Sequence, residues 1–131
     1  MPVHRKSQLD LFDLKNFKAE TLVVESAKLK RNPLKDSPIK RNPVLIPKTN
    51  AKELPVVLIL AGFTGNGPKY FSIKSFEDNF PQVLDQKLGA GEAPLAIYVF
   101  VDAWTRWGGS QFLNSKGTGA YEDYLIKELV P

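Results

Sequence analysis

The sequence predicts an α/β fold in which antiparallel strands precede a parallel β-α-β unit. Two unbroken apolar runs, 55–61 and 95–101, are typical of parallel strands that are covered on both faces. The segment between them carries apolar side chains at helical spacing and ends in the C-cap signal Gly89-Ala90-Gly91. These side chains are Phe76, Phe80, Val83, Leu84 and Leu88. The connection between the two strands is expected to be right-handed.

Two further strands are expected before this unit. Residues 19–29 are rich in β-branched side chains, and residues 41–46 form a second run that ends at Pro47. Prolines at 33 and 38 predict a turn between them, because a residue before proline is pushed out of the α region. Residues 1–18 favour an N-terminal arm or a short helix, so the partial α/β domain is expected to span 19–131.

The segment that follows the second parallel strand has the composition of a loop over residues 102–117. A last helix is expected to begin near Thr118 or Gly119, with Glu122 and Asp123 in its first turn, where the helix dipole favours anions. One face of this helix would carry Tyr121, Tyr124, Leu125 and Leu129.

The composition is that of one globular domain, since 131 residues with 43% hydrophobic content can bury a substantial core. The net charge of +4 is uneven: residues 1–54 carry 12 Lys/Arg against 6 Asp/Glu, and residues 55–131 carry 6 against 8. No aromatic residue is interleaved with the central basic group, which indicates a solvated surface rather than a nucleic-acid site. That group is Lys28, Lys30, Arg31, Lys35, Lys40 and Arg41.

The chain lacks the residues that most metal sites need. It has no cysteine, and its one histidine, His4, lies near the N-terminus, so no metal or other cofactor is expected. No stretch approaches the roughly 20 apolar residues of a membrane span, and the first residues do not resemble a signal peptide. A cytoplasmic protein without a membrane partner is predicted.

The glycine-rich turn after the first parallel strand bares backbone N–H groups and is suited to an anion. Gly62 and Gly67 have the spacing of a phosphate loop, but Pro68 occupies the position that requires lysine. The dinucleotide pattern also fails, because Gly62 and Gly65 are spaced wrongly. The alternatives that remain are that the loop stabilises a transient oxyanion or that it binds no ligand.

A complete catalytic triad is absent from this sequence. None of the seven serines lies in a G-x-S-x-G motif. Ser110 follows two glycines, but Phe112 stands where the next glycine is required and no histidine lies downstream. The adjacent carboxylates Glu122 and Asp123 would diverge by about 100° on a helix and cannot share a site.

Three segments together resemble a known family. They are Ala61-Gly62-Phe63-Thr64-Gly65, the block 101–115 with its Gly-Gly-Ser-Gln-Phe-Leu-Asn-Ser end, and 119–124. The resemblance covers about residues 20–131 and is to the esterase family of α/β-hydrolases that includes S-formylglutathione hydrolase (esterase D), enterochelin esterase and the mycolyltransferase antigens. It implies that the chain forms the N-terminal half of an α/β-hydrolase sheet, truncated before the nucleophile elbow.

The resemblance also implies site residues. The backbone N–H of Phe63 would donate to the oxyanion, with Thr64 as a neighbouring donor, and Ala61 stands where the family usually has histidine. A small-molecule ester or thioester would be the substrate. The residues expected to bind it are Gly62, Asp102, Trp104, Arg106, Ser110 and Gln111.

In this family the serine, the acid and the histidine follow later in the chain, so residues 1–131 alone are expected to be inactive. Strand 55–61 would then be an exposed edge, and its partner would be the missing C-terminal half or a second copy of the chain. Two alternatives are a non-catalytic binding or partner module built on the same half-fold, and an unrelated fold with a chance resemblance.

Overall fold

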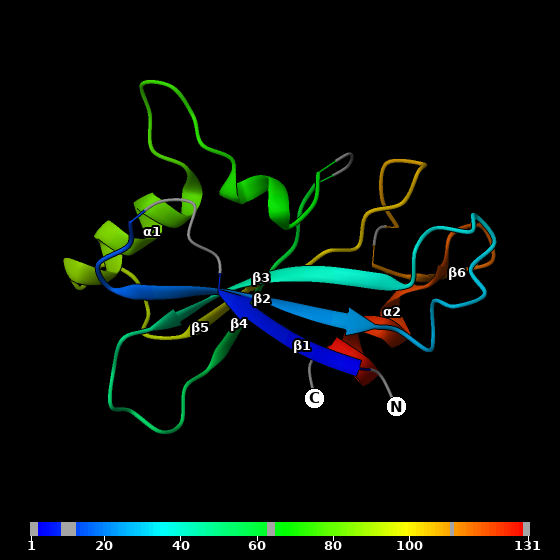
Figure 1. The fold of residues 1–131 in the computed structure, drawn as a ribbon, viewed down its shortest axis with the longest axis horizontal. Helices are drawn as coiled ribbons and strands as arrows, with labels where there is room; N and C mark the ends of the chain where they lie inside the picture. Colours follow the sequence, from blue (N-terminus) through cyan, green and yellow to red (C-terminus); the bar gives the residue numbers. More distant parts are fainter. Residues whose placement is uncertain (1–2, 9–12, 63–64, 111, 130–131) are drawn as a thin grey trace.

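The chain forms a mixed five-stranded sheet with the strand order β1-β2-β3-β5-β4 (Figure 1). The computed structural model describes residues 3–8, 13–62, 65–110 and 112–129. Antiparallel pairing joins β1 to β2, β2 to β3 and β3 to β5, whereas β4 and β5 are parallel. The strands are β1 (Val3–Gln8), β2 (Phe17–Glu25), β3 (Ile39–Pro47), β4 (Val56–Ile59) and β5 (Ile97–Phe100). The α/β class and its antiparallel-then-parallel arrangement are therefore confirmed.

The first predicted strand is shifted toward the N-terminus. It was expected to reach residue 29 but ends at Glu25, and the backbone N–H groups of residues 27–29 bond to side chains. Glu128 accepts from Ala27 and Lys28, and the Ser26 hydroxyl accepts from Leu29. Of residues 1–18, the described segment Val3–Gln8 is extended and pairs with β2.

Helix α1 (Phe80–Gly89) connects β4 to β5 after a short 3-10 helix, η1 (Pro68–Phe71). Asn79 begins α1 through a capping box with Gln82, which leaves Phe76 outside the helix. Phe76 is fully exposed and has a φ of 64°. Its predicted place on the packed helical face is therefore wrong. Leu84 carries that packing and is buried.

Strand β4 lies at the edge of the sheet. Within the described residues it pairs only with β5, and Val56 and Leu60 are 56% and 45% exposed. Both faces of this strand are partly covered, since Leu58 packs against one apolar cluster and Val57 and Ile59 pack against the other. The expectation of an exposed edge strand is confirmed.

The C-terminal segment contains a hairpin that the sequence prediction missed. Strand β6 (Asn114–Ser115), within the predicted loop, pairs with β7 (Gly119–Ala120), which lies where the last helix was expected to begin. One α-helical turn, α2 (Tyr121–Asp123), then continues as the π-helix η2 (Tyr124–Leu129). Figure 1 shows α1 and α2 toward opposite ends of the long axis.

Two apolar clusters cover the two faces of the sheet, because successive side chains of β5 alternate between the faces. One cluster contains Val24, Leu29, Val44, Val99, Val101, Ala103, Tyr121, Tyr124 and Leu129. The other contains Phe17, Leu45, Phe71, Leu84, Ala96, Tyr98 and Phe100. In the described part of the chain, no helix has the length and apolarity needed to cross a bilayer.

Candidate functional site

A hollow of about 360 Å³ lies at the carboxyl ends of the parallel strands β4 and β5. This end of an open α/β sheet is where ligands generally bind. The glycine-rich loop forms one wall and the segment 101–112 forms the other. We call it the strand-end hollow, and its lining is Ala61, Gly62, Gly65, Asn66, Val101, Ala103, Gly109, Ser110 and Phe112.

The glycine-rich loop is held directly against the end of β5. The Gly67 amide donates to the Val101 carbonyl at 3.0 Å, and the Gly65 amide donates to the Gly62 carbonyl at 3.0 Å. A Cβ at position 67 would lie only 2.2 Å from the Phe100 carbonyl oxygen, so glycine is needed there for this approach. Phe63 and Thr64, the predicted oxyanion donors, lie outside the described residues.

Ser110 lies in the opposite wall and is buried. Its hydroxyl lies 3.3 Å from the Ala103 carbonyl, to which it donates, and accepts from the Phe112 amide at 3.3 Å. The side chain thus closes a local turn within the wall. Gln111 lies outside the described residues.

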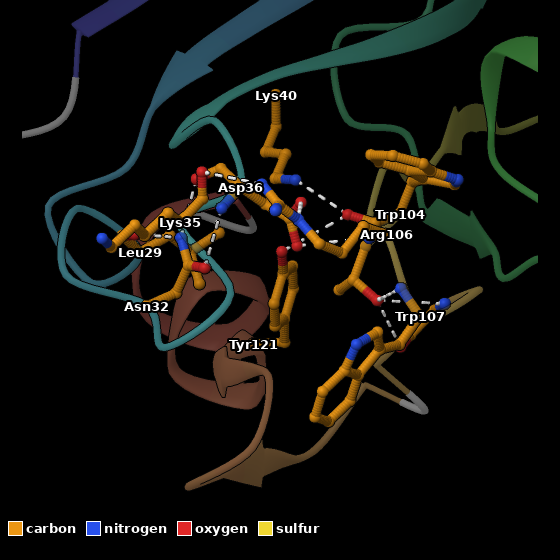
Figure 2. A network of polar contacts seen from close by, with 11 residues as sticks. Leu29, Asn32, Lys35, Asp36, Lys40, Trp104, Arg106, Trp107 and Tyr121 are labelled. Atoms are coloured by element: carbon orange, nitrogen blue, oxygen red, sulfur yellow. Dashed lines mark hydrogen bonds and ion pairs between the residues drawn. The ribbon is translucent and has the colours of Figure 1, made fainter.

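Two other predicted substrate residues, Trp104 and Arg106, belong to a polar network beside the hollow (Figure 2). Arg106 donates from Nε to the buried Asp36 carboxylate at 3.1 Å and from its amide at 3.3 Å. The Trp104 carbonyl accepts from Lys40 Nζ at 3.0 Å and from the Tyr121 hydroxyl at 3.3 Å. These polar groups bind other parts of the protein.

Asp102 also bonds within the protein. Its carboxylate accepts from the Arg41 amide at 3.0 Å, and its own amide donates to Asn42 Oδ1 at 2.8 Å. Asp102, Trp104 and Arg106 are not part of the lining of the strand-end hollow. The structure therefore brings Gly62 and Ser110 together and leaves the other three described residues in the supporting network.

Lys40 is the charged centre of this network. It is 3% exposed, and its ammonium lies 5.2 Å from the centre of the Tyr121 ring. Burial lowers the pKa of Lys40, and the charges of Asp102 and Asp36 oppose that shift. Burial, followed by the same two carboxylates, raises the pKa of Tyr121.

The solvated surface predicted for the central basic group is wrong for Lys40, because its position on β3 faces the core beside Asn42 and Val44. The alternation of side chains along β3 explains this burial, since residues 40, 42 and 44 are buried and Ile39 and Arg41 are exposed. The other five members of the group are exposed, as predicted: Lys28, Lys30, Arg31, Lys35 and Arg41.

A second hollow, of about 310 Å³, shares one wall with the first. Ala61, Gly62, Gly65 and Asn66 line both, and Lys69, Tyr70 and Lys74 complete the second. We call it the lysine hollow. Sequence reasoning did not find it, although the two lysines five residues apart after the glycine-rich loop were visible.

Neither a scan of protein-family models nor a search of curated protein sequences finds a match to this chain. Among the described residues, no three or more His, Asp or Glu side chains are grouped so that they could hold a metal ion.

Proposed function

We propose that this chain is the N-terminal portion of a serine esterase or related acyl hydrolase and supplies its oxyanion loop. The observation that carries the proposal is the meeting of the glycine-rich loop and the 109–112 segment around one hollow at the carboxyl ends of β4 and β5. An acyl-transfer enzyme needs backbone donors at such a place, since the tetrahedral intermediate develops a negative oxygen.

The strand order supports the same proposal. In the sheet order of α/β-hydrolases, the strand before the oxyanion loop lies between the next parallel strand and the nucleophile strand. Here β4 pairs with β5 on one side, and its other side is unpaired within the described residues. The nucleophile strand would add beside β4 and bring its serine to the strand-end hollow.

The mechanism assigns a separate task to each part. The Phe63 amide, with Thr64 as a neighbouring donor, stabilises the oxyanion, and a second donor follows the nucleophilic serine. The serine, histidine and acid come from polypeptide outside residues 1–131, because this sequence holds no triad. The strand-end hollow is of a size that suits the small acyl part of an ester or thioester.

The polar network has a supporting task in this scheme. Lys40 and Tyr121 donate to the Trp104 carbonyl, and the Asp36 carboxylate accepts from both the amide and the guanidinium of Arg106. These contacts fix the segment that leads to Ser110. We therefore propose that Arg106 and Asp102 position the wall of the hollow and do not bind substrate.

The test is hydrolysis of p-nitrophenyl acetate and butyrate by the protein encoded by the complete reading frame. We expect turnover and covalent labelling of one serine by a fluorophosphonate, while residues 1–131 alone show no turnover above background. A complete protein that neither hydrolyses these esters nor takes the label would reject the esterase and favour a non-catalytic binding module. Turnover by highly purified residues 1–131 would contradict the assignment of the triad to other polypeptide.

A further inference from the structure

The lysine hollow is positively charged although the second half of the chain is not. Residues 55–131 carry more Asp/Glu than Lys/Arg, 8 against 6. Two of those six cations, Lys69 and Lys74, nevertheless line one hollow, and its described lining contains no carboxylate. A hollow walled by cations and backbone favours a negatively charged ligand.

The hollow also has a fixed floor and a fixed backbone at Lys69. The Tyr70 ring packs 5.7 Å from the ring centres of both Phe80 and Phe100, so its position is set by the core. The Lys69 amide donates to Asn66 Oδ1 at 2.9 Å, which ties Lys69 to the glycine-rich loop. The backbone that carries the Lys69 charge is therefore held beside the shared wall.

The second cation is available to a ligand. Lys74 Nζ lies 3.7 Å from the Glu77 carboxylate, and the two side chains are 51% and 66% exposed. Such an exposed pair contributes little free energy. An incoming carboxylate can take the place of Glu77 at small cost, so Glu77 acts as a weak competitor.

We propose that the lysine hollow binds the carboxylate of an anionic substrate while its ester or thioester carbon lies against the shared wall formed by Gly62 and Gly65. The inference rests on the proposed function for the reacting end and on the lining of the hollow for the charged end. The two lysine ammonium groups are point charges on flexible stems, so they can reach a carboxylate on a short flexible chain. The substrate class is thus the monoester or monothioester of a small dicarboxylic acid, or an ester whose leaving group carries a carboxylate.

Binding to the 131-residue chain tests the charged end without any turnover. Monomethyl glutarate is titrated at low salt and followed by amide NMR shifts, with uncharged dimethyl glutarate as the matched probe. We expect millimolar binding of the monoester with shifts at Gly65, Asn66 and Tyr70, and at least fivefold weaker binding of the diester. Equal binding of the two esters, or no binding of the monoester, would overturn the proposal.

Three variants and one control test how each charge around the hollow changes the affinity for the monoester. Lys69→Met and Lys74→Met should each weaken monoester binding about fivefold, the effect of one charge about 4 Å away in water. Glu77→Gln should strengthen it about twofold, because the competitor is removed. Lys52→Met, at an exposed position outside the hollow, should leave it unchanged. A control variant that weakens binding as much as the hollow variants would show non-specific attraction and overturn the proposal.

Three further outcomes bear on the proposal, and the second and third of them separate it from the esterase. Methyl phosphate binding ten times more tightly than the monoester would reassign the hollow to phosphate and overturn the carboxylate assignment. Monoester binding with the expected variant effects, in a complete protein that hydrolyses no ester, would reject the esterase and retain the anion site. Hydrolysis of neutral esters without monoester binding would support the esterase and reject the anion site.

Discussion

The close approach of the glycine-rich loop to β5 predicts a specific sensitivity at Gly67. Its backbone has φ −58° and ψ −50°, which alanine adopts readily, so only space opposes a side chain there. An added Cβ would lie 2.2 Å from the Phe100 carbonyl oxygen and 2.8 Å from that of Val101. Both neighbours are backbone atoms at the end of β5 and cannot turn away as a side chain could.

The magnitude of the Gly67→Ala effect follows from two terms. Overpacking costs about 1–3 kcal/mol. Moving the loop away would also lose the 3.0 Å hydrogen bond from Gly67 to Val101, worth about 1 kcal/mol. The sum is about 2–4 kcal/mol. With an unfolding entropy of about 0.28 kcal/mol/K for a chain of this length, Tm should fall by about 7–14 °C.

Gly62→Ala is the matched control, because among the described residues, its two chain neighbours apart, no heavy atom lies within 4 Å of a Cβ added there. Alanine at such a position should be neutral or stabilise by up to about 1 kcal/mol, since it restricts the unfolded chain. The assay is thermal unfolding of both variants by circular dichroism, with urea unfolding to check the free energy. Equal Tm values for Gly67→Ala and the wild type would refute the close approach of the loop to β5.

Three further predictions concern the fold around the site. The pKa of Lys40 is lowered in the folded state, so between that pKa and 10.5 the unfolded state binds more protons, and the free energy of unfolding should rise with pH over this range. Urea unfolding at several pH values should show this rise, and Lys40→Met should abolish it. Phe76→Gly should be neutral or stabilise by up to about 1 kcal/mol in thermal unfolding, because Phe76 is fully exposed at a φ of 64°, and a loss above 1 kcal/mol would contradict this. Glu128→Gln should lower the free energy of unfolding in urea by about 2–3 kcal/mol, because the buried carboxylate accepts from the Ser26 hydroxyl at 2.6 Å and from two amides at 2.9 Å. An unchanged unfolding midpoint would argue against these contacts.

The parts of the fold that the sequence predicted are those that depend on local pattern. Continuous apolar runs located β4 and β5, β-branched residues located β2, and the run that ends at Pro47 located β3. The periodic spacing of Tyr121, Tyr124 and Leu129 identified the face of the last helix that enters the core. Its π-helical form was not predictable, because the spacing of these residues does not distinguish it from an α-helix.

Features that depend on distant contacts were not predictable in the same way. The burial of Lys40 requires the Trp104 carbonyl, 64 residues away, and the core position of its strand face. Arg106 was expected to bind substrate, but its partner Asp36 lies 70 residues away and becomes visible only in the folded chain. The lysine hollow differs, because its lining residues all lie between Ala61 and Lys74; the sequence did not show that these neighbouring turns curve around one hollow.

The esterase proposal depends most on the Phe63 amide, so its removal is the most direct test. In the protein encoded by the complete reading frame, Phe63→Pro removes that donor, and Phe63→Ala keeps it as a control. For p-nitrophenyl ester hydrolysis we predict that the proline variant loses about 10²–10³ in kcat with KM within about threefold, while the alanine variant stays within about tenfold in kcat. A folded proline variant with the wild-type kcat would contradict the assignment of this loop to the oxyanion hole.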